Sequence, residues 1–366
     1  MDQILRTASA LLGRQLTDPV DLGGSRRSTV LRCRTDAGGT VIVKAFTAEP
    51  ESHRAFTAEA AGLALGLGGP ELLAVDREFP LLVMADLGTA PTLADLLLGS
   101  DPKAAERGRL AWARGLGRLA AAGATRRAEF ERLWARYDQG LPSWTHEPWI
   151  AQNAADLPAV LAAAGVEPAP GLAAELARIG TAGGERYFGF TPGDTCPDNN
   201  LLTDGGLRLI DFESACFQSV FLTAAYCRMP FATCWCVFEP PAALADEVER
   251  TFRAEVVASW PELAEDACWE QGMTEAVAVW TVDLTVGLLP RALPEDAPMH
   301  RTRRPVPTRR QLLGHRWAKA AALPGLPALS GTMERLLTTV ASGWSAPTLP
   351  GYPAFEALSP GGRGGS

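Results

Sequence analysis

Lysine is nearly absent from this sequence. Of 34 basic residues only Lys44, Lys103 and Lys319 are lysines, and all the others are arginines. A basic excess is missing as well, because 42 acidic residues give the 366-residue chain a net charge of -8. Proteins that bind nucleic acid through its backbone need a cationic surface that displaces counterions. The charge balance therefore argues against a nucleic-acid partner.

The sequence also lacks an apolar segment suited to a membrane. Its longest charge-free stretch, residues 336–355, contains three prolines and two glycines. It therefore cannot form a spanning helix of about 20 apolar residues. The first residues include acidic Asp2 and have no long apolar core, so they do not resemble a secretory signal. We expect a cytoplasmic protein with no membrane partner.

Cysteine and histidine show no metal-binding spacing. The seven cysteines include no Cys-x-x-Cys pair, and only four histidines are scattered along the chain. This pattern argues against a zinc site and against a disulfide framework. Cys234 and Cys236 lie in an apolar run, where we expect small buried hydrophobic residues, with redox chemistry as the alternative.

The hydrophobic pattern divides the chain into two parts. A strand-rich part with one helix, residues 1–87, precedes a mostly helical part, residues 88–357, and a Gly-rich tail, 358–366, should be disordered. The strand-rich part contains the runs VDL, STVLRCRT, TVIVKAF, ELLAVDREF and LLVMADLG, with a helix predicted over about 51–67. This indicates an α+β fold with a small antiparallel sheet in one lobe and helices in the other.

A short hairpin is predicted inside the helical part. The turn signal Asp204-Gly205-Gly206 separates two apolar runs, 201–203 and 207–210, which should pair as antiparallel strands. With a register symmetric about Gly205, Asn199 would lie opposite Asp211, with Cα atoms about 5 Å apart.

Acidic and amide side chains gather at the open end of this hairpin. Asp194 and Asp198 approach Asn199 and Asp211 from the preceding loop, and hard oxygen ligands of this kind suit Mg2+. The alternative is that these residues only form turns, which both Asp and Asn favour.

Lys44 and Glu59 form a second candidate pair. Phe56, Glu59, Ala60 and Leu63 share one helical face, so Glu59 lies on the apolar face and needs a cationic partner. Lys44 ends the adjoining strand. Because this chain uses arginine at nearly every other basic position, a lysine here indicates a place where a compact ammonium fits and a guanidinium does not. The alternative is a lysine at a strand end and a glutamate at a helix edge, both reaching solvent.

A glycine-rich turn, VDLGGSRRSTVLRC, connects two of the predicted strands. Backbone amides near Gly24 and Ser25 could cover phosphate groups, and Arg26 and Arg27 would add positive charge. Such a turn more often only joins strands.

The order of these features carries more information than each one alone. The glycine-rich turn, the strand lysine, a glutamate 15 residues later, the strand LLVMADLG, an Asp-x4-Asn segment and an aspartate 17 residues after its first residue follow one another. This order resembles the protein-kinase-like fold and, within it, the aminoglycoside phosphotransferase family of small-molecule kinases. The resemblance covers about residues 19–230 and is specific at VIVK, DTCPDNNLL and LIDFE.

The resemblance implies a role for each residue at the open end of the hairpin. Asp194 corresponds to the catalytic base that accepts the proton of the attacking hydroxyl. Asn199 and Asp211 correspond to the Mg2+ ligands, and Asn200 would replace Asn199 if the register shifted by one.

The resemblance also implies a nucleotide site. Lys44, positioned by Glu59, would hold the α- and β-phosphates of ATP or GTP, and Gly24 and Ser25 would cover them. The backbone of Met84, Ala85 and Asp86 would face adenine. The implied activity is transfer of the γ-phosphate to a hydroxyl of a small molecule by a monomer or homodimer.

One motif departs from the family. His-Gly-Asp is usual there, whereas this sequence has Pro192-Gly193-Asp194. Because that histidine mainly supports the loop, we expect its replacement to affect the geometry of the loop more than the chemistry of proton transfer. The alternatives are an inactive pseudokinase that senses nucleotide or acts as a scaffold and, more remotely, a Mg2+-dependent hydrolase.

In the sequence, only the distribution of charge and of tryptophan residues bears on the identity of the acceptor. The segment 238–299 contains 13 acids and 3 bases, and such a field would attract a cationic acceptor, such as an aminoglycoside or another amino-bearing metabolite. Solvated helix faces, or pairing with the arginines of 301–310, explain the same acids. Four tryptophans could stack on a sugar ring or belong to the core: Trp235, Trp260, Trp269 and Trp280.

Overall fold

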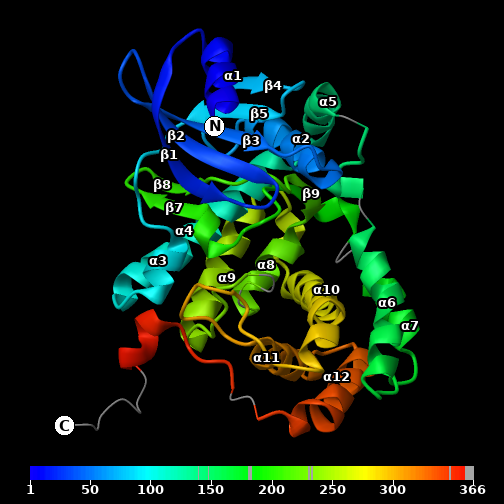
Figure 1. The fold of residues 1–366 in the computed structure, drawn as a ribbon. Coiled ribbons are helices and arrows are strands. Elements are labelled where there is room, and N and C mark those ends of the chain that lie inside the picture. Colours follow the sequence, from blue (N-terminus) through cyan, green and yellow to red (C-terminus); the bar gives the residue numbers. More distant parts are fainter. Residues whose placement is uncertain are drawn as a thin grey trace, which may run out of the picture.

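The computed structural model describes residues 1–138, 140–146, 148–179, 184–229, 231, 234–345 and 348–358. A sheet-containing lobe formed by the N-terminal part of the chain lies against a larger helical lobe (Figure 1). The predicted α+β fold with two lobes is confirmed. Residue 87, the predicted boundary, falls between the last strand of the N-terminal sheet and the first helix of the helical lobe.

The N-terminal lobe is built on one five-stranded antiparallel sheet in the order β1-β2-β3-β5-β4. Its elements are α1 (Asp2–Leu12), β1 (Leu16–Gly24), β2 (Ser28–Thr35), β3 (Thr40–Phe46), α2 (Pro50–Ala64), β4 (Leu72–Asp76) and β5 (Leu81–Ala85). The helix α1 was not predicted. It is short and covers one face of the sheet, where Ala8 is fully buried.

The two faces of β3 divide its residues between two cores. Val43 belongs to the small core that the sheet forms with α1, whereas Lys44 is the next residue along the strand. Because successive side chains of a strand point to opposite faces, Lys44 and Phe46 lie on the other face. That face is covered by α2, and the Phe46 and Phe56 rings meet edge to face at 5.7 Å. The alternation thus places Lys44 between the sheet and α2.

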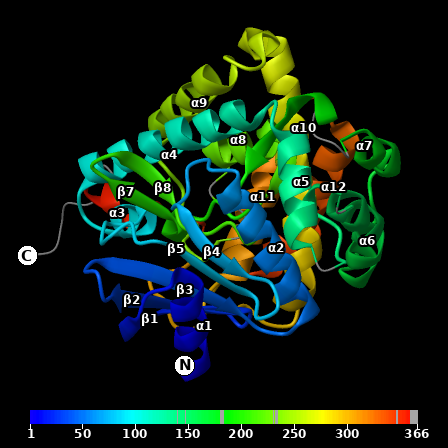
Figure 2. The same ribbon diagram turned by 90° about the horizontal axis from the view of Figure 1, so that it is seen from above.

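The helical lobe contains most of the hydrophobic core. Its helices are α3 (Leu93–Leu98), α4 (Pro102–Gly123), α5 (Arg127–Tyr137), α6 (Trp149–Ala163), α7 (Leu172–Ile179), α8 (Val220–Arg228), α9 (Ala242–Val256), α10 (Asp266–Ala292), α11 (Arg309–Ala321) and α12 (Pro327–Thr339). The same core continues into α2 and β5 of the sheet lobe, and Figure 2 shows α2 beside α5 of the helical lobe. This core therefore connects the two lobes, while the other face of the sheet forms its own small core with α1.

The helix α10 runs through the middle of this lobe. Among the described residues it is the one helix with the length and composition of a membrane span, and 72% of its most apolar window is buried inside the protein. A helix that is apolar on all sides belongs in a protein core or in a membrane. Its burial here accounts for its composition.

Two small hairpin-like pairs lie between the helices. β7 (Asn200–Thr203) pairs with β8 (Gly206–Leu209), as predicted, and β6 (Phe188–Thr191) pairs with β9 (Cys216–Ser219). The strand β9 was not predicted. A short 3-10 helix, Pro353–Leu358, includes the first residue of the predicted disordered tail, and 359–366 lie outside the described residues.

Candidate active site

A cleft of about 1070 Å³ lies between the glycine-rich turn, the end of β5 and the loops around β7 and β8. Eight of the ten predicted site residues line it: Gly24, Ser25, Lys44, Met84, Ala85, Asp86, Asn199 and Asp211. The other two contact its wall. Glu59 binds Lys44, and the backbone oxygen of Asp194 accepts a bond from Asn199 at 3.5 Å. The fold thus brings the predicted residues to one place.

Lys44 is the central cation of this cleft. Its side chain is buried, and its ammonium forms an ion pair with Glu59 of α2. The same ammonium lies 3.1 Å from Asp211 Oδ1 and 3.9 Å from Glu213 Oε2. A single ammonium thus contacts carboxylates of two chain segments. The alternative of a strand-end lysine in solvent does not fit this position.

The charges around Lys44 act on its pKa and on that of Glu59. Burial lowers the pKa of Lys44, but the charges of Asp211, Glu59 and Glu213 outweigh burial and raise this pKa above its ordinary value. Burial raises the pKa of Glu59 above its ordinary value, although the Lys44 ammonium opposes the shift. Lys44 therefore stays charged at neutral pH.

Glu213 is a site residue that the sequence reasoning did not single out. It is buried, its amide donates to Asp211 Oδ1 at 3.1 Å, and its carboxylate forms an ion pair with Arg27 of the glycine-rich turn. Arg27, which was considered as a phosphate contact, is therefore bound to the segment that carries Asp211. The sequence signal available was the LIDFE motif, in which Glu213 follows Asp211 by two residues.

The glycine-rich turn needs glycine at one position. Gly24 has φ of 153°, and a Cβ there would lie 2.3 Å from the Ser28 backbone oxygen. The turn is closed by the Ser25 amide, which donates to that oxygen at 3.2 Å, and by the Ser25 hydroxyl, which accepts from the Arg27 amide at 3.0 Å. The close approach of the two strands thus depends on Gly24 having no side chain.

The predicted register of the hairpin is wrong by one residue. β7 and β8 pair Asn200 with Leu209 and Thr203 with Gly206, so the turn has two residues and its centre lies between 204 and 205. Asn199 therefore lies across from Ile210 and not across from Asp211. The Ile210 amide donates to the backbone oxygen of Asn199 at 3.2 Å. Gly206, which pairs with Thr203, has φ of 100°, a backbone conformation that favours glycine.

The two neighbouring asparagines have different surroundings. Asn199 lines the cleft, whereas Asn200 is fully buried and its side-chain amide donates to the backbone oxygens of Thr195, at 3.3 Å, and Cys196. Because Asn200 binds the inside of the loop, its position fits a support for the loop. Asn199 has the position expected of a ligand.

The loop that carries Asp194 is closed without the family's histidine. Gly193 has φ of 83°, and a Cβ there would lie 2.2 Å from the Ser214 backbone oxygen. The Gly193 amide donates to the Thr191 hydroxyl at 3.1 Å, and the Cys196 amide donates to Asp194 Oδ1 at 3.0 Å. Pro192 itself is buried. Backbone hydrogen bonds and the close approach at Gly193 thus hold the loop in place without the histidine that usually supports it.

The carboxyl group of Asp194 has a strongly perturbed pKa. Burial raises the pKa of Asp194 to about 6, and the negative charges of Asp211, Asp198 and Glu213 act in the same direction. The Cys196 amide, which binds the ionised form, opposes the shift. A carboxyl group with this pKa is suited to accept a proton near neutral pH.

A disulfide joins Cys196, in this loop, to Cys234. Cys234 and Cys236 are both buried, as expected, but the interpretation of Cys234 as only a small hydrophobic residue is wrong, because it is half of a disulfide, whereas Cys236 is a free thiol. The two half-cystines are 38 residues apart, with Cα atoms at 5.7 Å. Their proximity comes from the tertiary fold, and no Cys-x-x-Cys spacing signalled it.

One end of the cleft carries an aromatic and cationic cluster. The Trp235 indole donates to Asp198 Oδ2 at 2.9 Å, and Arg303 binds the same oxygen at 2.8 Å while its guanidinium lies 4.5 Å from the Trp235 ring. Of the four tryptophans considered for a sugar ring, Trp235 lines the cleft, whereas Trp260 and Trp269 are buried in the core. Arg303 was not predicted, because it comes from a segment more than 100 residues away.

The acid-rich segment 238–299 does not border this cleft: none of its acids is among the described lining residues. Many of them bind basic side chains on the helices. Arg228 binds Glu249 and Glu270, both at 2.6 Å, and Arg253 binds Asp266 at 2.7 Å. The expected negative field at the acceptor site is therefore not provided by these acids.

Comparison with known proteins identifies the family. A family model described as the phosphotransferase enzyme family matches residues 20–265. The chain belongs to this family. The family predicted from the motif order is confirmed, as is the prediction of an enzyme that acts as a small-molecule kinase. Lys44 and Asp211 lie inside the matched region, and Arg303 lies outside it.

Solved structures resemble this phosphotransferase in fold. A choline kinase from Cryptosporidium parvum is 11% identical, with a TM-score of 0.50, covering 87% of this chain and 93% of that one. An ethanolamine kinase from Plasmodium vivax is 12% identical, with a TM-score of 0.51 and coverage of 87% and 83%. A macrolide 2'-phosphotransferase from Brachybacterium faecium is 17% identical, with a TM-score of 0.49 and coverage of 88% and 97%. A search of curated proteins found no match.

Proposed function

We propose that this phosphotransferase uses ATP or GTP, together with Mg2+, to phosphorylate a hydroxyl group of a small molecule. The observation that carries the proposal is the buried Lys44 ammonium, which Glu59 and Asp211 hold at the wall of the cleft. A buried cation fixed by carboxylates from two chain segments is suited to bind phosphate oxygens, because its position is set before the ligand arrives.

The nucleotide would lie along the N-terminal side of the cleft. Lys44 would bind the α- and β-phosphates, and the amides near Gly24 and Ser25 would cover them. The Ala85 amide already donates to the Glu71 oxygen at 2.9 Å, so adenine would bind the remaining backbone groups of residues 84–86. The Asp86 carboxylate binds Arg32 and Thr40, which leaves its backbone for the base.

The residues at the other wall fit a divalent cation. Asp211 and Asn199 present oxygen ligands to the cleft, and Mg2+ prefers such ligands. Asp198, Asp211 and Glu213 already raise the pKa of Asp194, so negative charge is crowded at this place. When bound, the cation would neutralise charge on the phosphates during transfer. Asp211 and Asn199 are the proposed ligands.

Asp194 is the proposed general base. Its carboxylate is fixed through Oδ1 by the Cys196 amide, which leaves Oδ2 for the hydroxyl of the acceptor. Because the pKa of Asp194 is raised to about 6, this carboxylate is ionised at neutral pH and still basic enough to accept a proton as the hydroxyl attacks.

The acceptor would bind at the end of the cleft that carries Trp235. An aminoglycoside or another amino-bearing metabolite is the acceptor class that the family resemblance implies. The charged residues Asp95, Asp198, Arg303 and Arg304 line the cleft here, and Arg303 and Asp198 form an ion pair. Because both signs are present, an acceptor screen should include neutral and anionic alcohols together with aminoglycosides, macrolides and choline.

A nucleotide-binding scaffold without activity is the alternative function, and Pro192 is the feature that favours it. The closed loop around Gly193 and Asp194 argues against it, because the hydrogen bonds that hold Asp194 are formed. Formation of ADP or GDP that depends on a defined hydroxyl acceptor would exclude the scaffold.

The nucleotide site can be tested by thermal unfolding with ATP or GTP, each with Mg2+ and with chelator. A ligand that binds only the folded state stabilises it by about 2.7 kcal/mol at 100 times its dissociation constant. We expect a nucleotide-induced rise in Tm that requires Mg2+ and is lost in Asp211→Ala. No shift with either nucleotide at millimolar concentration would contradict the proposal.

The chemical step can be tested with the acceptor panel. We expect Asp194→Asn to bind nucleotide like the wild type and to lose acceptor-dependent turnover by at least about 100-fold. Asp204→Asn is the matched control, because Asp204 is an exposed residue of the β7–β8 turn. Full turnover in Asp194→Asn would show that another group accepts the proton.

A further inference from the structure

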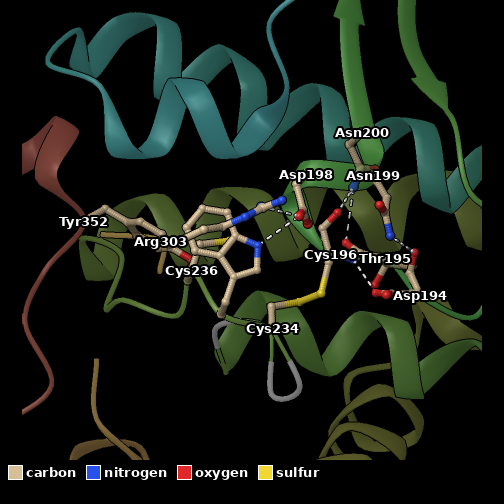
Figure 3. The surroundings of a disulfide bond; sticks show 11 residues. Asp194, Thr195, Cys196, Asp198, Asn199, Asn200, Cys234, Cys236, Arg303 and Tyr352 are labelled. Atoms are coloured by element: carbon tan, nitrogen blue, oxygen red, sulfur yellow. Dashed lines mark hydrogen bonds and ion pairs between the residues drawn. A yellow bond between two sulfur atoms is a disulfide. The ribbon is translucent and has the colours of Figure 1, made fainter. Parts of the chain in front are cut away.

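The Cys196–Cys234 disulfide lies directly against the proposed catalytic base. A carboxylate oxygen of Asp194 and the Sγ atoms of Cys196 and Cys234 all lie within 4.8 Å of one another. Figure 3 shows the sulfur atoms of the bridge beside Asp194, at the base of the loop that also carries Asn199. The bridge therefore connects the loop of the catalytic base to a second chain segment.

Cys196 is central to the hydrogen bonds of this loop. Its amide donates to Asp194 Oδ1 at 3.0 Å, and its backbone oxygen accepts from the Asn199 amide at 2.9 Å and from the Asn200 side chain. A displacement of Cys196 would therefore move Asp194 and Asn199 together. The disulfide fixes the residue on which both depend.

A second link runs parallel to the disulfide. Asp198 of the same loop accepts a hydrogen bond from Trp235, the residue that follows Cys234, and Arg303 contacts both. Asp198, Trp235 and Arg303 all line the acceptor end of the cleft. The disulfide thus holds together the loop of the base and the wall of the proposed acceptor site.

This bridge is the one disulfide among seven cysteines, all of which lie in the described part of the chain. Burial raises the pKa of Cys216 and of Cys227 to about 12 and also raises the pKa of Cys236, which disfavours the reactive thiolate. A protein with so large a core does not need a disulfide to fold, as small secreted domains do. In the cytosol, which is the compartment that the sequence predicts, a disulfide is more often transient, catalytic or redox-sensing than structural.

We propose that Cys196 and Cys234 form a reversible redox-modification site, whose co-reactants are low-molecular-weight thiols and disulfides. On oxidation each thiol loses one proton and one electron as the sulfur–sulfur bond forms, and a low-molecular-weight disulfide takes up both electrons and both protons to give two thiols. The oxidised state orders the loop, and the reduced state releases Cys196 from Cys234. The expected effect on phosphoryl transfer rests on the proposed function. The redox chemistry of Cys196 and Cys234 does not depend on that function.

The bridge lies beside the cleft. Cys196 and Cys234 are 8% and 4% exposed and are not among the described lining residues, whereas the nearby Asn199 and Trp235 line the cleft. We expect local opening of the loop to admit small thiols, which would then reduce the bridge in the folded protein.

The first experiment measures the bond itself in glutathione buffers of graded redox potential. We expect five free thiols in the oxidised protein and seven in the reduced protein. Peptide mapping should find Cys196 linked to Cys234, and the change should be reversible without unfolding. A pair that stays unlinked in oxidising buffer, or a bond that glutathione and dithiothreitol leave intact in the folded state, would overturn the proposal.

The second experiment measures the loop by hydrogen exchange of the oxidised and reduced protein. Exchange in residues 194–200 and 234–238 should be faster after reduction, and exchange in β3 should not change. Cys234→Ala should exchange like the reduced wild type in either buffer. Cys236→Ala is the matched control, because Cys236 is buried two residues away and is unpaired, and it should respond to reduction like the wild type. Equal exchange in both redox states would overturn the proposal without any reference to catalysis.

The third experiment follows acceptor-dependent turnover with the first alcohol that the panel identifies, or nucleotide hydrolysis by water if no alcohol reacts. We expect reduction to lower kcat/KM for the acceptor by about tenfold, because a shift of about 1 Å in a positioned group can cost up to ~100-fold. The Kd for nucleotide at saturating Mg2+, measured by thermal unfolding, should change less than kcat/KM, although the Mg2+ concentration needed for binding should rise because the same loop carries Asn199. An altered nucleotide Kd with unaltered acceptor turnover would contradict the placement of the effect at the acceptor side. If no phosphoryl transfer occurs in either redox state, the proposed function fails and the first two experiments still decide the redox site.

Discussion

Lys44 and Asp211 meet across the cleft with Nζ 3.1 Å from Oδ1, although 167 residues separate them in the chain. Lys44 belongs to the sheet lobe and Asp211 follows β8 in the helical lobe. This contact and the Arg27–Glu213 ion pair connect the two lobes at the place where phosphates are proposed to bind. A ligand at this place would contact both lobes at once.

The Lys44 ammonium should be required for stability as well as for nucleotide binding. In Lys44→Met the buried Glu59 carboxylate loses its partner, and removal of one member of a buried ion pair costs about 3–5 kcal/mol. Lys44→Met/Glu59→Gln should recover part of the unfolding free energy and none of the nucleotide binding. Urea unfolding measures the first effect and thermal shift with nucleotide the second. Lys103→Met, at an exposed lysine, is the control and should lie within about 0.5 kcal/mol of the wild type.

The pH dependence of turnover should report Asp194. Its pKa is raised to about 6, and the base must be ionised to accept the hydroxyl proton. We therefore expect kcat/KM to fall as pH decreases through about 6. The measurement is the pH profile of acceptor-dependent ADP formation at saturating Mg2+. A flat profile from pH 5 to 8 would contradict the assignment of the base.

The same shift predicts that Asp194 destabilises the fold when it is ionised. Its folded pKa lies above the ordinary value of 3.8, so stability that is present at lower pH is lost as pH rises through about 6. Asp194→Asn cannot ionise and should be more stable than the wild type at pH 8, by up to about 3 kcal/mol, and not at pH 4. Denaturant unfolding in chelator at both pH values provides the test, and an equal difference at both would contradict it.

Asn199 and Asn200 should be separable by substitution. Asn200 is fully buried and holds two backbone oxygens of the loop, so Asn200→Ala should cost about 1–3 kcal/mol of unfolding free energy. Asn199→Ala should leave stability within about 0.5 kcal/mol and weaken the Mg2+ dependence of nucleotide binding. Titration of Mg2+ at fixed nucleotide measures this. The opposite assignment of the two effects would make Asn200 the ligand, which is the alternative that the sequence left open.

Gly193 should tolerate no side chain. A Cβ at Gly193 would meet the Ser214 backbone oxygen at 2.2 Å with φ of 83°, so we expect Gly193→Ala to cost at least about 1–3 kcal/mol and to displace Asp194. Gly205→Ala is the control, because its nearest neighbour is 3.7 Å away. Unfolding free energy and turnover should both fall in the first variant and stay near wild type in the second.

Much of the site could be predicted because its residues belong to short motifs in a fixed order. The helical period of α2 placed Glu59 on the apolar side, where it needs a cationic partner, and Lys44 at the end of the adjoining strand was the nearest candidate. The register of the hairpin could not be predicted in the same way. The composition Asp204-Gly205-Gly206 permits a turn of two residues or of three, and the pairing of Thr203 with Gly206 is visible only in the structure.

Contacts between segments that are far apart in the chain could not be predicted from the sequence either. Cys196 and Cys234 have no characteristic spacing, and Arg303 reaches Asp198 from a loop that follows α10. The short strand β9 forms only because β6 lies beside it, and an isolated four-residue run carries no such signal.

The sequence by itself determined the α+β class, the family and the order of the candidate site residues, because hydrophobic period and motif spacing are properties of the chain. The tertiary structure alone decided which side chains meet: Glu213 with Arg27, Cys196 with Cys234, and Trp235 with Asp198. These pairs are set by how the helices and strands pack in space, and packing depends on all of the core residues together.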